Sequence, residues 1–146
     1  MVIGAFAALA AGAPIGPTRD IDITPELSHG NLTRLSAALA DLDARVFTET
    51  VPEGLPFSHD PAPLGSVAVW NLVCSHGRLD IAFRPSGFDD GYTALVDRAV
   101  EVDIGGELIW IAGLDDIIRS KQAAGRPKDL QVLPILLRHQ TGRSRH

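Results

Sequence analysis

The first 23 residues, MVIGAFAALAAGAPIGPTRDIDI (residues 1–23), contain the pattern that decides the fold. A short apolar start reaches Gly4, and the alanine-rich run that follows predicts a helix that ends at Gly12. A loop rich in Gly and Pro leads to DIDI at residues 20–23, where alternating polar and apolar side chains predict a half-buried strand. The segment therefore predicts a strand–helix–strand unit whose second strand carries two carboxylates on one face.

The same segment has the apolar run and small residues of a secretion signal. Such a signal starts with a positively charged segment, whereas the first basic residue here is Arg19, after the apolar run. The single cysteine, Cys74, also fits a reducing compartment. We therefore expect a cytoplasmic protein.

Composition indicates one folded domain with a core of its own. The chain has 146 residues, of which 45% are hydrophobic and 21% charged, so a disordered composition is excluded. No run approaches the roughly 18 apolar residues of a membrane span, and we expect no membrane partner.

Charge is distributed unevenly along the chain. Residues 1–116 carry 6 basic and 17 acidic side chains, whereas residues 117–146 carry 7 basic and 1 acidic. A basic end of this kind indicates a contact with phosphate or nucleic acid, although Arg138, Arg143 and Arg145 also fit a solvated tail.

Periodicity predicts the remaining elements. Leucines at helical spacing predict a helix over residues 31–46 with Asn31 as its N-cap. Turn residues between strand-like runs predict two hairpins, at 66–85 and 100–112. The other expected elements are a long loop at 48–66, a short helix at 91–99, a helix at 114–124 ended by Gly125, and a helix at 126–139 kinked or broken before Pro134.

Together these elements predict an α/β (α+β) fold. We expect a single domain over residues 1–138, with a mixed sheet of about five strands flanked by helices. Two C-terminal helices are expected to close a cleft, and residues 139–146 form a polar basic tail.

The carboxylates of the DIDI strand are candidate metal ligands. Asp20 and Asp22 project to one side of the strand, about 6 to 7 Å apart. Their hard oxygens suit Mg²⁺, and a pair of such ions about 4 Å apart clamps the attacking and leaving oxygens in phosphoryl transfer. Asp80, on another expected strand, would supply a third carboxylate. An ordinary pair of acids on an exposed strand face remains the alternative.

The pattern Ile3-Gly4-Ala5 followed by Asp20-Ile21-Asp22 resembles the nucleotidyltransferase superfamily with the DNA polymerase β-like fold. Downstream, CSHGRLDIAF (residues 74–83) and GLDDIIRSKQAAGRPKDL (residues 113–130) are similar to AbiE-type toxin nucleotidyltransferases and small bacterial relatives. The likeness covers residues 1–137 apart from the loop at 48–66 and implies this fold for the domain.

The resemblance also implies roles for individual residues. Asp20 and Asp22 would hold Mg²⁺, while Asp80 would activate the acceptor hydroxyl or bind a second Mg²⁺. Arg19 would pair with Asp129 or with phosphates. The nucleotide would be bound by Gly4, Ala5, Arg19, Lys121, Arg126 and Lys128, with Asp129 in a supporting position; the alternative for Lys121 is a solvated helix residue.

The implied activity is transfer of a nucleotide from an NTP to a hydroxyl acceptor, which in toxin relatives is transfer RNA, with an antitoxin or other protein as a further partner. The chain departs from the family pattern at Ala5, which lacks a hydroxyl, at Val132, where an acid often stands, and in starting within the first strand. Ala5 and Val132 support the alternative of a catalytically inactive binding or antitoxin-like module.

Other polar and aromatic residues point to structural roles. His59, Cys74 and His76 lack the spacing of a zinc site. Trp70 and Trp110 lie in expected strands and are predicted to belong to the core rather than to stack on bases.

Overall fold

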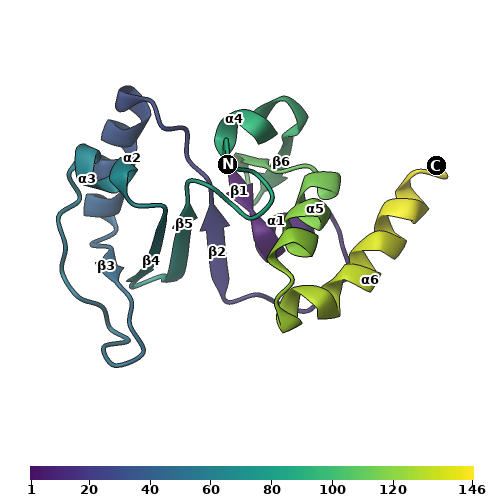
Figure 1. Ribbon diagram of the computed structural model, residues 1–146, viewed down its shortest axis with the longest axis horizontal. Coiled ribbons are helices and arrows are strands. Elements are labelled where there is room, and N and C mark those ends of the chain that lie inside the picture. The colour runs from purple at the N-terminus through teal and green to yellow at the C-terminus, as the bar shows by residue number, and fades with distance from the viewer.

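The computed structural model describes residues 1–146 and contains a seven-stranded mixed sheet that runs through the whole molecule (Figure 1). The strand order is β3-β4-β5-β2-β1-β7-β6, with β2–β5 and β1–β7 parallel and the other pairs antiparallel. The strands are β1 (Val2–Ile3), β2 (Asp20–Ile23), β3 (Arg45–Val46), β4 (Val69–Cys74), β5 (Gly77–Ala82), β6 (Val100–Ile104) and β7 (Glu107–Ile111).

The expected mixed sheet with flanking helices is confirmed, but the expected number of about five strands is wrong. The strand that was not expected is β3, whose two residues are too short to produce an alternating pattern. Both predicted hairpins are present, as β4–β5 and β6–β7. The turn of the second contains Gly105 and Gly106 at φ 65° and 91°, a conformation that favours glycine.

Helices lie against both halves of the sheet (Figure 1). The helices are α1 (Gly4–Ala10), α2 (His29–Asp41), α3 (Pro61–Ser66), α4 (Tyr92–Leu95), α5 (Leu114–Ala124) and α6 (Pro127–Arg143), with a 3-10 turn at Val96–Arg98. One core forms where α2 and α3 meet β4 and β5, around Leu39, Leu64 and Ile81. A second forms where α1, α5 and α6 meet β7, around Ile111 and Leu136. The hollow described below lies between these two packed halves.

The predicted bounds of α2 are wrong at both ends. Ser28, rather than Asn31, is the N-cap, because its hydroxyl accepts a hydrogen bond from the backbone N–H of Asn31 at 3.3 Å. At the other end, Asp43 takes φ 48° and the chain turns into β3, so Val46 belongs to a strand. Helical spacing of apolar residues continues past the turn, which explains the overestimate.

Helix α6 runs through Pro134, and the break expected before this residue is not found. The helix also extends to Arg143, so most of the expected polar tail at 139–146 is helical. No helix of the protein is long and apolar enough to span a membrane.

The two tryptophans differ in burial. Trp70 stacks on Phe57 with ring centroids 5.0 Å apart and donates a hydrogen bond to the carbonyl of Leu64. Trp110 is 54% exposed, so its predicted place in the core is wrong. In register, Trp110 lies opposite Glu101 on β6, the last strand at that edge of the sheet.

Candidate active site

Sheet register brings the three predicted carboxylates onto one face. In the parallel pair β2–β5, Asp22 lies directly opposite Asp80, and Asp20 lies opposite Arg78. Neighbouring strands are about 4.8 Å apart, and residues two apart on one strand share a face. Asp20, Asp22 and Asp80 therefore form a carboxylate cluster, a name used below for these three residues.

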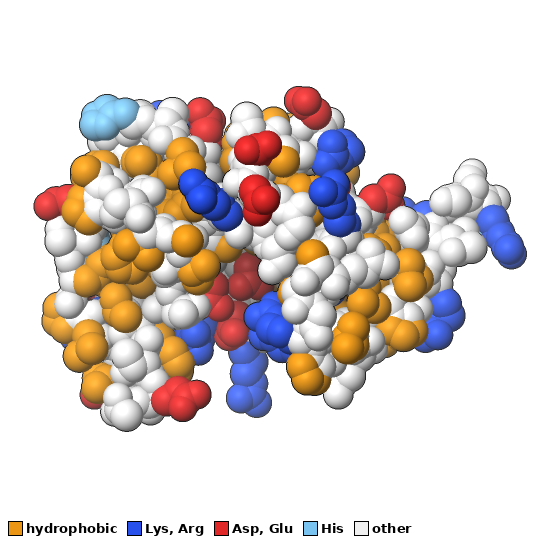
Figure 2. Space-filling view, viewed as in Figure 1, with side chains coloured by type: hydrophobic (Ala, Val, Ile, Leu, Met, Phe, Trp, Pro, Cys, Tyr) orange, Lys and Arg blue, Asp and Glu red, His pale blue; other side chains and the backbone are white.

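The carboxylate cluster lies in a pocket of about 730 Å³ between the two halves of the molecule. Figure 2 shows acidic atoms at the bottom of this hollow, with Lys and Arg side chains beside them. Every residue that the sequence assigned to the site lines this one pocket: Gly4, Ala5, Arg19, Asp20, Asp22, Asp80, Lys121, Arg126, Lys128 and Asp129. Strands β2 and β5 supply the carboxylate cluster, while Lys121 lies on α5, Lys128 on α6, and Arg126 at the N-cap of α6.

The structure explains why glycine is needed at position 4, which the sequence alone did not. Gly4 has φ 70°, and a Cβ atom at this position would overlap the Asp22 carboxylate. Glycine therefore lets the Asp22 side chain lie against the backbone where β1 passes into α1. The Asp22 carboxylate therefore occupies the space beside the Gly4 Cα.

The surroundings of Asp22 and Asp80 disfavour the ionised forms of these two carboxyl groups. Burial raises the pKa of Asp22, the charges of Asp80 and Asp20 raise it further, and Lys128 and Lys121 only partly oppose them. Burial also raises the pKa of Asp80, against the opposing charge of Arg78. Crowded carboxylates of this kind favour binding of a cation.

Asp129 lies in the opposite electrostatic environment. Its side chain is 1% exposed; Arg126 Nε lies 2.7 Å from Oδ2, and Lys121 Nζ lies 3.3 Å from Oδ1. Burial alone would raise its pKa, but the hydrogen bonds and charges of Arg126 and Lys121 outweigh burial and bring the pKa below its ordinary value.

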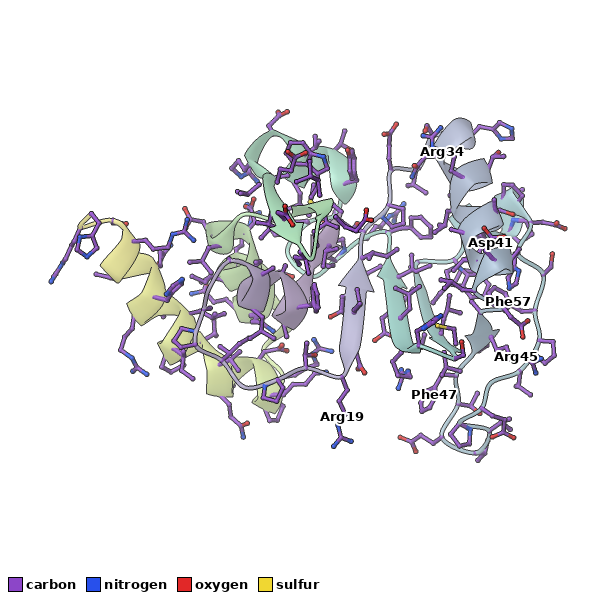
Figure 3. All side chains as sticks on the ribbon, turned by 180° about the vertical axis from the view of Figure 1, so that it is seen from behind. Arg19, Arg34, Asp41, Arg45, Phe47 and Phe57 are labelled. Atoms are coloured by element: carbon purple, nitrogen blue, oxygen red, sulfur yellow. The ribbon has the colours of Figure 1, made fainter.

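These contacts correct two expectations. Asp129 pairs with Lys121 and Arg126, whereas Arg19 is exposed and forms no ion pair with it. Figure 3 shows Arg19 at the start of β2 with its side chain directed away from the ribbon. Lys121 is 12% exposed, so the alternative of a solvated helix residue is wrong. Arg19, Arg84, Arg126 and Lys128 are the exposed bases at the pocket, and of these only Arg126 forms an ion pair there.

The residues present fit magnesium by their donor type. Mg²⁺ takes one or two carboxylates and completes its shell with water and substrate phosphates, which Asp20 and Asp22 on one strand face satisfy. No group of three or more His, Cys, Asp or Glu side chains converges on a single point, and Asp80 is turned toward Arg78. Of the residues considered for zinc, His59 contacts the carbonyl of Ala44 at 2.8 Å through Nε2.

Three polar residues near the cluster were missed. Asn71 lies opposite Asp80 on β4 and lines the pocket, as does the exposed Arg84. Arg78 lies two residues before Asp80 and pairs with it at 3.4 Å. Counting back from the predicted hairpin turn would have found Asn71, and the two-residue strand period would have found Arg78.

No protein-family model and no curated protein sequence matches the chain.

Proposed function

We propose that the protein is a metal-dependent nucleotidyltransferase of the DNA polymerase β-like superfamily, similar to the AbiE-type enzymes, which moves a nucleotide from an NTP to a hydroxyl acceptor. The observation that carries this proposal is the parallel register of Asp22 with Asp80, which places three carboxylates in one pocket with the bases of α5 and α6. RNA is the proposed acceptor, because Arg19, Arg84 and Lys128 are exposed cations that line this pocket.

Each pocket residue has its own proposed role in the transfer. Asp20 and Asp22 would hold Mg²⁺, which supplies charge compensation for the phosphates when bound. Lys128, exposed at the start of α6, attracts the triphosphate, and Lys121 with Arg126 is held in place by Asp129. Asp80 accepts the proton of the acceptor hydroxyl. The hydroxyl oxygen then bonds to the α-phosphorus, and the bond from that phosphorus to pyrophosphate breaks.

Total RNA incubated with Mg²⁺ and each α-labelled NTP tests the proposal. We expect label to enter RNA with the wild-type chain and to be undetectable with Asp20→Asn or Asp22→Asn. Glu107→Gln is the matched control, because Glu107 is an exposed acid on β7 away from the pocket. Equal labelling by wild type and Asp22→Asn would reject the proposed role of the cluster.

A second candidate is a catalytically inactive binding module of the same fold. Ala5 favours it, because this pocket residue offers a phosphate no hydroxyl. Both candidates predict Mg²⁺-dependent NTP binding, so calorimetry distinguishes them from a chain with no nucleotide site. The labelling assay distinguishes them from each other, because only the enzyme transfers label to RNA.

A further inference from the structure

Arg78 contacts Asp80 from the same face of β5. Its Nη2 lies 3.4 Å from Asp80 Oδ1, and the two side chains are 26% and 23% exposed. Its Nε donates a hydrogen bond to the carbonyl of Leu72 at 3.3 Å. Two different nitrogens of one planar guanidinium are therefore held, which restricts where Arg78 can direct its charge.

A third contact comes from outside the hairpin. The guanidinium carbon lies 3.6 Å from the centroid of the Phe47 ring, a cation–π contact. Phe47 follows β3, and its backbone N–H donates to the carbonyl of Asn71 at 2.9 Å (Figure 3). The position of Phe47 is therefore fixed by β4, and the chain of contacts from Phe47 through Arg78 ends at Asp80.

This arrangement has no role in holding the two packed halves together. Both ends of the ion pair lie on β5, which β2 and β4 already hold by backbone hydrogen bonds. Arg78 also lies opposite Asp20 in the β2–β5 register. Of the three carboxylates of the cluster, however, the Arg78 guanidinium pairs only with Asp80.

We propose that Arg78 is a positioning residue, fixed by Phe47, that orients the Asp80 carboxylate and acts as its counter-ion until a divalent cation binds. The proposal rests on the proposed function, since it gives Arg78 a task in that site. It goes beyond it by naming a residue that touches neither nucleotide nor acceptor. Arg78 would act only through Asp80, which makes the idea testable by a double-mutant cycle.

The cycle uses Arg78→Gln, Asp80→Asn and the double variant, with two readouts. In the transfer assay, Arg78→Gln should lower kcat about 10- to 100-fold, with the KM for NTP within about twofold of wild type. In calorimetry with Mn²⁺ alone, Arg78→Gln should bind Mn²⁺ about threefold or more tightly, because a competing positive charge is removed. Neither change should appear when Asp80 is already Asn.

Two milder variants test the contacts that hold the Arg78 guanidinium in place. Arg78→Lys keeps the charge but not the planar fork, so it should recover part of the lost kcat. Phe47→Leu should also lower kcat, but by less than Arg78→Gln does. Arg45→Gln is the matched control, because Arg45 lies on β3 two residues before Phe47 and its only ion pair is with the exposed Asp43.

Several results would overturn the positioning role. These are an unchanged or weaker Mn²⁺ affinity in Arg78→Gln, an equal effect of Arg78→Gln in the Asp80→Asn background, or a parallel loss in Arg45→Gln. If wild type binds Mn²⁺ but transfers no label, the calorimetric cycle still decides the role of Arg78 while the proposed transfer fails. If wild type binds no Mn²⁺, both proposals are wrong.

Discussion

Asp22 and Asp129 line the same pocket, but their surroundings shift their pKa values in opposite directions. Asp22 lies among other carboxylates, so its ionised form is opposed by burial and by Asp80 and Asp20. Asp129 lies between two cations that favour its ionised form. Removing the charge should therefore have opposite effects on stability at the two positions.

Asp22→Asn should stabilise the metal-free protein at neutral pH by about 1 kcal/mol, because it removes a repelled, partly buried charge without changing the shape of the side chain. Thermal unfolding in EDTA measures this change. A lower Tm than wild type would mean that repulsion from Asp80 and Asp20 does not destabilise the protein at Asp22. Glu107→Gln, exposed on β7, should leave the Tm unchanged.

Asp129→Asn should destabilise the protein by about 3 kcal/mol. This value is the lower end of the range usual for breaking a buried ion pair, because Arg126 is 60% exposed and its charge is screened by solvent. The pKa of Asp129 is lowered in the folded state, so its stabilisation is present above the ordinary pKa of about 3.9 and is lost as pH falls through the lowered value.

The Tm difference between wild type and Asp129→Asn should therefore narrow as pH falls below about 4. Asp89→Asn, at an exposed loop position, is the control. A difference that stays constant from neutral to acidic pH would show that the charge of Asp129 is not what stabilises the fold.

Helix α6 contains the exposed Pro134, which has no backbone N–H to donate to the carbonyl one turn before it. Pro134→Ala should restore this hydrogen bond and stabilise the protein by about 1–3 kcal/mol, measured by urea unfolding. Gln131→Ala, exposed on the same helix, should change stability by less than about 0.5 kcal/mol. An equal or lower stability for Pro134→Ala would mean that α6 depends on the geometry that proline imposes.

Elements with explicit end signals were predictable from sequence. The glycine pair at 105–106 fixed the β6–β7 hairpin, and Gly125 in the left-handed conformation ends α5 as expected. Elements without such signals were not predictable. The two-residue β3 has no pattern, and the apolar spacing that marks α2 continues beyond its real end.

At the scale of the whole molecule, the sheet joins two packed halves and the pocket lies between them. A bound nucleotide would contact β2, β5, α5 and α6, so it should stabilise the whole chain. With Mg²⁺ and NTP at 100 times the Kd, linkage predicts about 2.7 kcal/mol of added stability. Differential scanning calorimetry should show a higher Tm with both ligands. The Tm should not rise with NTP in EDTA, nor with both ligands in Asp22→Asn. An equal rise in Tm in EDTA would show that NTP binding does not require the metal.

All ten residues assigned to the site from sequence line one pocket, because strand period and helix order already place them on neighbouring faces. Their partners were less predictable. Asp129 pairs with Lys121 and Arg126 rather than Arg19, and Asp80 pairs with Arg78, which was not assigned to the site from sequence. These choices depend on how helices and strands pack in three dimensions, which the local pattern of residues does not specify.

The position of the transferred label tests the central claim most directly. Parallel reactions with α-labelled and γ-labelled NTP, Mg²⁺ and RNA separate transfer of a nucleotide from transfer of a phosphate. The account predicts α-label on the RNA, γ-label released as pyrophosphate, and neither event with Asp22→Asn. Transfer of γ-label to RNA, or α-label transfer that persists in Asp22→Asn, would contradict it.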